Sequence, residues 1–397
     1  MNSSRHNDQT AVPDTRPLPP PSAEEQAHSE RLARRLREEV AQAGGAIPFS
    51  RFMELALYAP GLGYYAAGKH KFGAAGDFVT APELGPLFAR CLARPCRQIL
   101  QALAGGEILE AGAGSGALAA DLLLELESLG CLPTRYAILE LSAELRARQA
   151  ETLMHRAPHL LPRVYWLEGL PADFRGVVLA NELLDAVPVE RFHVAPDGVH
   201  QFHVTWQNDR FAWVEKPAEP AVQDRVAPLA LAPGYTSEIN LRAEAWVRSM
   251  AAVLQAGVLL LIDYGFPRAE FYHPQRMDGT LMCHYRHRAH ADPLILVGLQ
   301  DITAHVDFSA IAAAGTGTGL RLLGYTSQAA FLIGCGLEQL AAASDPDNVR
   351  RHLELTQQIK KLTLPHEMGE LYKVIAFGRG VEEPLLGFTI QDRRGRL

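Results

Sequence analysis

The part of the chain that most constrains its fold is a short apolar segment that runs into three closely spaced glycines. Ile108 and Leu109 are typical of the end of a buried strand, and Gly112, Gly114 and Gly116 follow at alternate positions. Glycine adopts left-handed backbone conformations that other residues avoid, so this spacing predicts a tight turn. Apolar residues beyond the turn predict a helix. A strand, a glycine turn and the first turn of a helix together form a site where backbone N–H groups meet a ligand.

A carboxylate, Glu110, lies two residues before the first glycine. A phosphate-binding loop would avoid a negative charge here, whereas a ligand with a cationic or hydroxyl-rich part would favour it. S-adenosyl-L-methionine, a sulfonium amino acid, is such a ligand. The same stretch also satisfies the looser G-x-G-x-x-A dinucleotide pattern through Ala117, so a nicotinamide cofactor and an NAD-dependent oxidoreductase stay open as the alternative. Glu140, at the end of the next predicted strand, would hold ribose hydroxyls in either case.

Strands and helices alternate along most of the chain. Continuous apolar strands are predicted at residues 136–141, 164–167, 177–180 and 258–265, with helical sequences between them. Such strands imply a mostly parallel sheet with helices on both faces. The predicted fold class is therefore α/β, and sheets of this kind bind ligands at the carboxyl ends of their strands.

The remaining segments are predicted to surround this sheet. The divisions are a disordered proline-rich tail (1–21), an N-terminal helical cap with a glycine-rich loop (22–105), the sheet domain (106–380) and a loose C-terminal tail (381–397). Insertions are expected at about 188–235, where the hydrophobic period of two predicts β-hairpins, and at 266–305, which is predicted to be irregular. Further helices are expected from about residue 83 to 103 and from Ser237.

Composition excludes several classes of protein. The net charge of −7 argues against a general nucleic-acid binder. The five cysteines are scattered and form no C-x-x-C pair, so reduced thiols are expected and no metal site is predicted. No apolar run reaches the ~18 residues that a membrane-spanning helix needs. The N-terminus lacks the pattern of a signal or transit peptide, and a cytoplasmic protein is expected.

A polar cluster, Asn181-Glu-Leu-Leu-Asp185, directly follows the predicted strand at 177–180. At the carboxyl end of a strand, such a cluster would lie beside the reacting methyl group of a bound methyl donor. A nicotinamide enzyme would not need it there. Asparagine and aspartate are also good helix caps, so capping stays open as the alternative for Asn181 and Asp185.

Several motifs together resemble the MidA family, whose mitochondrial members are respiratory complex I assembly factors. The resemblance runs from about Ile47 to Gly378. The matching segments are Tyr58-Ala-Pro-Gly-Leu-Gly-Tyr-Tyr65, Gly76-Asp-Phe-Val-Thr-Ala-Pro-Glu83, the glycine turn, Asn181-Glu-Leu-Leu-Asp-Ala-Val-Pro188, Ile262-Asp-Tyr-Gly265 and Gln300-Asp-Ile-Thr-Ala-His-Val-Asp-Phe308. Ala81 departs conservatively from the serine expected at its position.

The resemblance implies a class I S-adenosylmethionine-dependent methyltransferase: a Rossmann-like, mostly parallel seven-stranded sheet with the helical cap and the hairpin insertion described above. It implies methyl transfer to arginine on a protein substrate, giving symmetric dimethylarginine on a complex I subunit in the mitochondrial members. A respiratory-chain subunit is thus a candidate partner, and the oligomeric state stays open. The alternative from a different class of protein is a non-catalytic assembly factor, which would bind the cofactor only to hold its own shape.

Site residues follow from these motifs. A guanidinium has a pKa above about 12 and delocalised lone pairs, so carboxylates are needed to orient it for attack. The candidate catalytic residues are Asp77, Glu182 and Asp185, and Asp301 and His305 are second-rank candidates for the same role. The expected cofactor-binding residues are Glu110, Gly112, Gly114, Gly116, Glu140, Asn181, Gly76 and Thr80.

Two further features carry weaker predictions. The run from His284 to His290 is rich in basic residues, but no cysteine cluster accompanies it to complete a zinc site. It is interpreted as a loop over the active site, with a plain surface loop as the alternative. Trp206 and Trp213 are interpreted as hairpin packing.

Overall fold

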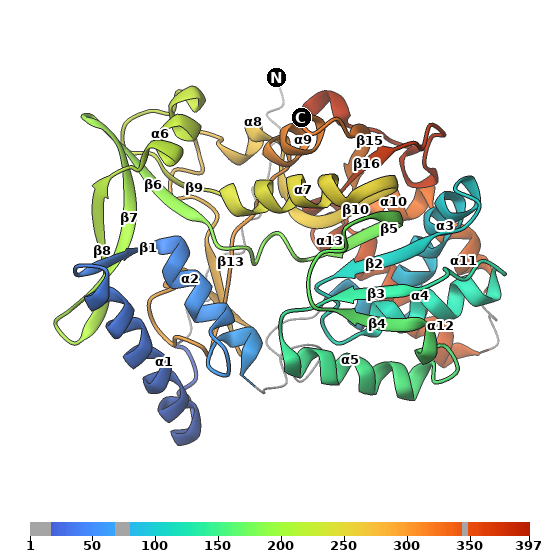
Figure 1. Ribbon diagram of the computed structural model, residues 1–397, viewed down its shortest axis with the longest axis horizontal. Coiled ribbons are helices and arrows are strands. Elements are labelled where there is room, and N and C mark those ends of the chain that lie inside the picture. The colour runs from blue at the N-terminus through green and yellow to red at the C-terminus, as the bar shows by residue number, and fades with distance from the viewer. Residues whose placement is uncertain (1–16, 68–79, 344–347) are drawn as a thin grey trace.

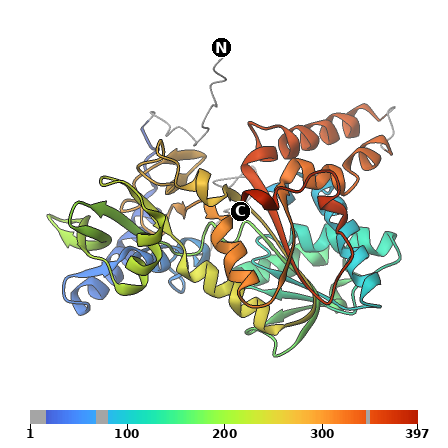
Figure 2. The same cartoon turned by 90° about the horizontal axis from the view of Figure 1, so that it is seen from above.

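The computed structural model describes residues 17–67, 80–343 and 348–397. The described chain has two parts that lie side by side (Figure 1). One part is a large sheet covered by helices, and the other is a smaller antiparallel lobe built around α1 and α2. Seen from above in Figure 2, the lobe in blue and green lies beside the part that holds the cyan and red helices. Gly76 and Asp77 lie outside the described residues.

The central sheet has the predicted mostly parallel arrangement. Its strand order is β15-β16-β10-β5-β2-β3-β4, and β14 extends it by pairing with the end of β10. Strand β16 runs antiparallel to both of its neighbours, whereas the other neighbouring pairs are parallel. The strands are β2 (Glu107–Ala111), β3 (Tyr136–Leu139), β4 (Val164–Leu167), β5 (Phe174–Asn181), β10 (Leu254–Phe266), β14 (Val306–Asp307), β15 (Arg321–Ser327) and β16 (Tyr372–Arg379).

Helices cover both faces of this sheet, which explains its continuous apolar strands. Val258 and Leu260 face a core shared with α3 and α4, while Leu259 and Leu261 face a core shared with α7 and α9. The helices of this part are α3 (Leu87–Ala102), α4 (Ala117–Ser128), α5 (Ala143–Arg156), α7 (Leu241–Val253), α8 (Arg268–Phe271), α9 (Phe308–Thr316), α10 (Gln328–Gly334), α11 (Leu337–Ala342), α12 (Val349–Thr363) and α13 (Met368–Leu371).

The smaller lobe joins two segments that are far apart in the sequence. Its sheet has the order β1-β7-β6-β9, with β8 beside β7. Strand β1 from the N-terminal region pairs with β7 of the insertion, with Ile47 opposite Val204. The elements are α1 (Ala23–Gln42), β1 (Ala46–Pro48), α2 (Phe49–Tyr58), β6 (Glu190–Ala195), β7 (Gly198–Gln207), β8 (Arg210–Pro217), α6 (Pro220–Val226) and β9 (Thr236–Ile239). The predicted hairpins are confirmed, and Trp206 and Trp213 pack against the core of this lobe.

The second insertion is more regular than the sequence predicts. It forms a three-stranded sheet from β11 (Met282–Tyr285), β12 (Arg288–His290) and β13 (Asp301–Thr303). The expectation of irregular structure is wrong because the two-residue turn between β11 and β12, Arg286-His287, has φ angles of 47° and 59° without the glycine or asparagine that usually signals such a turn. The basic run is therefore a β-hairpin, and its first strand carries His284.

The starts of two helices also differ from the prediction. Ser237 belongs to β9, and Asn240 caps α7 instead, its side-chain oxygen accepting from the N–H of Ala243 at 2.8 Å. β9 forms because the free edge of β6 provides a pairing partner that local sequence does not reveal. Helix α3 begins at Leu87 because Gly85, with φ of 139°, interrupts the chain before it.

The C-terminal residues are packed rather than loose. Val381, Leu385 and Phe388 are buried in the core on one face of the sheet. Arg393 forms an ion pair with Glu370 at 2.8 Å. The segment is ordered because its apolar residues cover helix and strand surfaces.

Two features are absent from the described residues. None of their helices combines the length and apolar character needed to cross a membrane. Within the same ranges, no group of three or more His, Cys, Asp or Glu side chains is arranged to hold a metal ion.

Candidate active site

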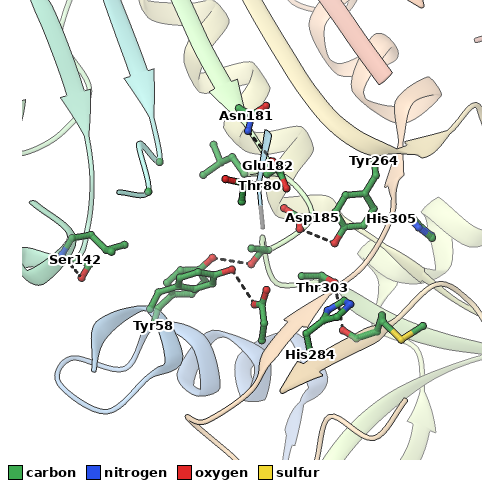
Figure 3. A pocket seen from close by; sticks show the side chains of 18 of the residues that line it. Tyr58, Thr80, Ser142, Asn181, Glu182, Asp185, Tyr264, His284, Thr303 and His305 are labelled. Carbon is green, nitrogen blue, oxygen red and sulfur yellow. Dashed lines mark hydrogen bonds between the residues drawn. The ribbon is translucent and has the colours of Figure 1, made fainter. Parts of the chain in front are cut away.

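A cavity of about 1150 Å³ lies at the carboxyl ends of the central strands, where the smaller lobe faces the sheet (Figure 3). The cavity is strongly acidic. Eight of its described lining residues are Asp or Glu, whereas one of them, Arg276, is a lysine or arginine. The guanidinium of Arg276 donates to the backbone carbonyls of Glu270 and Phe271. The acids are Glu83, Glu110, Glu140, Glu144, Glu182, Asp185, Asp278 and Asp301.

The glycine turn forms one wall of the cavity. Gly112, Gly114 and Gly116 have φ angles of 70°, 53° and 84°, which lie in the left-handed region and explain the requirement for glycine. A Cβ at Gly112 would also lie 2.8 Å from the side chain of Leu183. Gly112 and Gly114 line the cavity, whereas Gly116 is the N-cap residue of α4 and is absent from the described lining. Gly116 was predicted to bind the cofactor, but in the structure it shapes the turn from which α4 begins and does not line the cavity.

Glu110 and Glu140 lie beside this turn. Glu110 is 3% exposed, and burial raises its pKa to about 7, although the hydroxyl of Tyr136 donates to it at 2.8 Å. Glu140 follows β3 and accepts from the backbone N–H of Ser142 at 2.9 Å. Burial also raises the pKa of Glu140. Both carboxyls line the cavity.

Residues 80–83 lie beside the glycine turn. Thr80 and Glu83 line the cavity, and the hydroxyl of Ser115 donates to the carboxylate of Glu83. The N–H of Ala81 donates to Glu182 at 3.3 Å. This segment therefore connects the glycine turn with the acids that follow β5.

Glu182 is held in an unusual backbone conformation directly after β5. Its φ is 51°, which is costly for a residue with a Cβ and is found preferentially at functional sites. Its N–H donates to the carbonyl of Ile262 in β10 at 2.9 Å. The carboxylate accepts from Tyr372 and Asn181, each at 3.0 Å. Burial, and then the nearby charge of Asp185, raise the pKa of Glu182 to about 7.

Asp185 is the second acid of this segment, and it is buried. The hydroxyl of Tyr264 donates to its Oδ2 at 2.8 Å, and its Oδ1 has no hydrogen-bond partner among the described residues. Burial raises the pKa of Asp185 to about 6. Asp263 lies behind it and accepts from the N–H groups of Leu184 and Asp185 at 2.8 and 3.3 Å.

Aromatic side chains complete the far wall. Tyr58 and Tyr65 stack with ring centroids 5.6 Å apart, and Tyr65 donates to Asp301 at 2.9 Å. His284 and His305 also line the cavity. Burial lowers the pKa of His284 to about 4, and burial with the charges of Arg276 and Lys373 lowers that of His305 to about 3. Both imidazoles are thus neutral at physiological pH.

Most of the predicted site residues converge on this cavity. Thr80, Glu110, Gly112, Gly114, Glu140, Asn181, Glu182, Asp185, Asp301 and His305 line it. Their roles stay predictions, as do those of Asp77 and Gly76 outside the described residues. Capping does not account for Asn181 and Asp185, because no helix begins between β5 and β6.

Sequence reasoning missed four side chains that shape the site: Asp263, Tyr264, Tyr372 and Gln149. The first two follow an apolar strand, so the rule that polar residues at strand ends form sites applies to them. Tyr372 begins β16, and its antiparallel direction brings the start of this strand to the edge where the other strands end. Gln149 lies mid-helix, where no local signal distinguishes it.

The arrangement suits a ligand that carries positive charge and ribose hydroxyls. Glu140 offers a buried carboxylate for hydroxyls, and the Oδ1 of Asn181 is buried without a partner among the described residues. S-adenosylmethionine has both features. A pyrophosphate would lie close to the buried carboxyl of Glu110, which disfavours the dinucleotide alternative.

Comparisons with known proteins agree with this chemistry. The chain is 50% identical to a Burkholderia thailandensis protein whose crystal structure contains S-adenosyl-homocysteine, with a TM-score of 0.93 over 96% of this chain and 100% of that one. It is 28% identical to the mitochondrial protein arginine methyltransferase NDUFAF7 of Homo sapiens, over 84% of this chain and 80% of that protein. The Drosophila melanogaster homologue of that protein is also 28% identical, over 90% and 88% of the two chains.

A family profile described as "Putative S-adenosyl-L-methionine-dependent methyltransferase" matches residues 91–326. The matched region contains the glycine turn, the acids after β5 and the end of β10. The fold, the acidic cavity and this match lead to one conclusion: the chain belongs to this family of S-adenosyl-L-methionine-dependent methyltransferases.

Proposed function

We propose that this cavity methylates the guanidinium group of an arginine side chain in a protein substrate. The observation that carries the proposal is a pair of acids beside the glycine turn, the partly buried Glu182 and the buried Asp185. Neither forms an ion pair with a Lys or Arg of residues 17–67, 80–343 and 348–397, and the second oxygen of Asp185 has no partner there. Buried carboxylates without a counter-charge are costly, and a cationic ligand removes that cost.

The donor side of the cavity is assigned to the glycine turn, Glu140 and Asn181. When bound, S-adenosylmethionine supplies a methyl group activated by its sulfonium. The turn offers backbone N–H groups, and the Glu140 carboxylate offers acceptors for ribose hydroxyls. The buried acidic wall around Glu110 favours the positive charge of the donor.

The acceptor side is assigned to Glu182, Asp185 and the tyrosines. A guanidinium pairs with carboxylates through parallel N–H···O bonds, which fixes its plane as well as its position. The stacked rings of Tyr58 and Tyr65 offer flat faces to a planar cation. The nitrogen that takes the methyl group loses a proton, and we assign its acceptance to the carboxylate of Asp185, whose Oδ1 has no hydrogen-bond partner among the described residues.

The names of the relatives support arginine as the acceptor. Proteins from several animals that are 24–28% identical to this chain are named protein arginine methyltransferases. We extend the proposal to symmetric dimethylarginine and to a respiratory-chain subunit as the substrate, on the family resemblance alone. Asp77 stays a candidate for the same acidic site.

The test is methyl transfer from isotope-labelled S-adenosylmethionine to proteins of a lysate from a strain that lacks the gene. Mass spectrometry of the labelled peptides identifies the modified residue. We expect methylarginine with the wild type and a loss of at least about 100-fold with Glu182→Gln, as expected when a charged contact to the reacting group is removed. Calorimetry with S-adenosylhomocysteine is expected to show unchanged binding in this variant.

Glu354→Gln on α12 is the matched control, because this acid is 57% exposed on the surface and lies outside the cavity lining. It is expected to leave transfer unchanged. Label on another residue type would overturn the arginine assignment. Binding of S-adenosylhomocysteine without any transfer would favour the non-catalytic assembly factor.

A further inference from the structure

A buried glutamine joins two parts of the cavity wall, the glycine turn and Glu140. Gln149, on α5, is 0% exposed and lies outside the cavity lining. Its amide nitrogen donates to the carbonyl of Gly114 at 3.1 Å and to the Oε2 of Glu140 at 3.1 Å. Its amide oxygen accepts from the indole N–H of Trp166 at 2.9 Å. One side chain thus connects the glycine turn, the carboxyl end of β3 and β4.

The orientation of this amide is determined by its partners. An indole N–H can only donate, so Trp166 must face the amide oxygen. The amide nitrogen then faces Gly114 and Glu140, which both present acceptors. A flipped amide would lose all three hydrogen bonds, so the network has a single consistent arrangement.

Glu140 is held by donors on both of its oxygens. Ser142 donates its backbone N–H to Oε1, and Gln149 donates to Oε2. These two donors fix the plane of the carboxylate before any ligand binds, and Glu140 lines the cavity. The helix carrying Gln149 also packs closely on the turn, since a Cβ at Gly116 would lie 3.0 Å from the Cα of Gln149.

We propose that Gln149 is a positioning residue for the methyl donor: it fixes the ribose-binding carboxylate of Glu140 in the arrangement that the donor requires, while the carbonyl of Gly114 and the indole of Trp166 hold its amide in place. Gln149 touches no ligand itself. The inference depends on the binding of donor by this cavity and is independent of which acceptor is methylated, so the two proposals fail separately.

The test measures the dissociation constants of S-adenosylhomocysteine and of its 2′,3′-dideoxyribose analogue by calorimetry. Met has nearly the shape of Gln without its polar atoms, so Gln149→Met removes the network with little change in packing. We expect the wild type to bind the dideoxy analogue much more weakly than S-adenosylhomocysteine. We expect Gln149→Met to lose about 10- to 100-fold in affinity for S-adenosylhomocysteine, the usual effect of a lost hydrogen bond to a charged group.

The decisive comparison is between the two ligands. If Gln149 acts through Glu140, the variant loses much less affinity for the dideoxy analogue, because that analogue lacks the hydroxyls that Glu140 would bind. Equal losses for both ligands would show a merely structural role and overturn the proposal. Unchanged binding of S-adenosylhomocysteine would overturn it as well.

Two further variants protect the test against misfolding. Trp166→Phe removes the donor that orients the amide, and we expect a smaller loss of about two- to fivefold for S-adenosylhomocysteine alone. No loss in this variant would contradict the proposal even if Gln149→Met does not fold. Gln328→Met is the matched control, since Gln328 is also 0% exposed and its amide donates to the carbonyl of Leu362, away from the cavity lining. It is expected to lower thermal stability and leave both dissociation constants unchanged.

Discussion

At the scale of single residues, Glu182 combines several unfavourable features in one position. It has a left-handed backbone, a partly buried carboxyl and a buried acid, Asp185, nearby. Each feature costs folding free energy, and such costs are typical of residues kept for function. The N–H groups and hydroxyls around the carboxylate hold it in place without neutralising its charge.

The cost at Glu182 predicts that removing its charge stabilises the ligand-free protein. The pKa rises from 4.5 to about 7 on folding, so between these values the folded state binds a proton that the unfolded chain has lost. Its contribution to stability therefore falls as the pH rises through this window, and the penalty is complete above the folded pKa. Glu182→Gln is expected to raise the free energy of unfolding by about 1–3 kcal/mol at about pH 8 and by much less at about pH 5. Urea denaturation at both values measures this, and a variant less stable than the wild type at the higher pH would contradict it.

The same carboxyls predict how activity depends on pH. Glu182 and Asp185, with pKa values of about 7 and about 6, must lose their protons to pair with a cationic acceptor. We expect kcat/KM for the acceptor to fall as the pH decreases through this range. Because a bound cation favours ionised carboxyls, the fall in kcat is expected at lower pH than the fall in kcat/KM. Initial rates at varied acceptor concentration test this, and coincident profiles would argue against pairing with a cation.

At the scale of elements, the segment after β5 is attached to the end of β10. The carboxylate of Asp263 accepts from Leu184, Asp185 and Tyr264, at 2.8, 3.3 and 2.9 Å. It is 1% exposed and does not line the cavity. It therefore acts on the acids through the backbone that carries them.

This attachment predicts different effects for two substitutions of Asp263. Asp263→Ala leaves three buried N–H groups without an acceptor, and we expect it to lower the free energy of unfolding by about 2–4 kcal/mol and to abolish transfer. Asp263→Asn retains an oxygen for Leu184 and Asp185, so it is expected to fold and to keep measurable activity. Thermal denaturation and labelled methyl transfer measure both.

Asp307 provides the control for this pair. Its carboxylate accepts from the N–H groups of Ser309 and Ala310 at 3.0 and 3.1 Å at the start of α9. Asp307→Ala is expected to cost about 1 kcal/mol, as loss of a helix cap does, without changing kcat. Equal loss of activity in the two alanine variants would show that Asp263 has no special relation to the site.

At the scale of the whole molecule, the chain carries a net charge of −7. The cavity shares this negative character, because its described lining has eight acids and one arginine. A cationic protein segment would approach along this field, and salt would screen the attraction. We expect KM for a peptide with a basic acceptor segment to rise about two- to tenfold between about 0.05 M and 0.5 M salt.

The dissociation constant of S-adenosylhomocysteine is the internal reference for that measurement. This ligand is a zwitterion without net charge, so its binding is expected to change little over the same range. Equal salt dependence of the two quantities would indicate a general effect on the fold rather than attraction of a cationic acceptor.

The sequence by itself determined the central sheet and the cavity wall formed by the glycine turn and the acids at the strand ends. Apolar strands such as 177–180, separated by helices, can bury both faces only in a parallel sheet, and three alternating glycines can form only a tight turn. Glu110, Glu140 and the acids after β5 lie at strand ends, so their convergence follows from the sheet alone.

The tertiary structure decided the opposite wall. Tyr58 and Asp301 are far apart in the sequence and meet at the cavity because β1 pairs with β7 and the β11–β13 sheet packs beside it. Tyr372 reaches the site through the reversed direction of β16. Gln149 acquires its role from three hydrogen bonds to distant elements. Periodicity and turn chemistry describe only near neighbours in the chain, whereas these contacts depend on how whole elements pack.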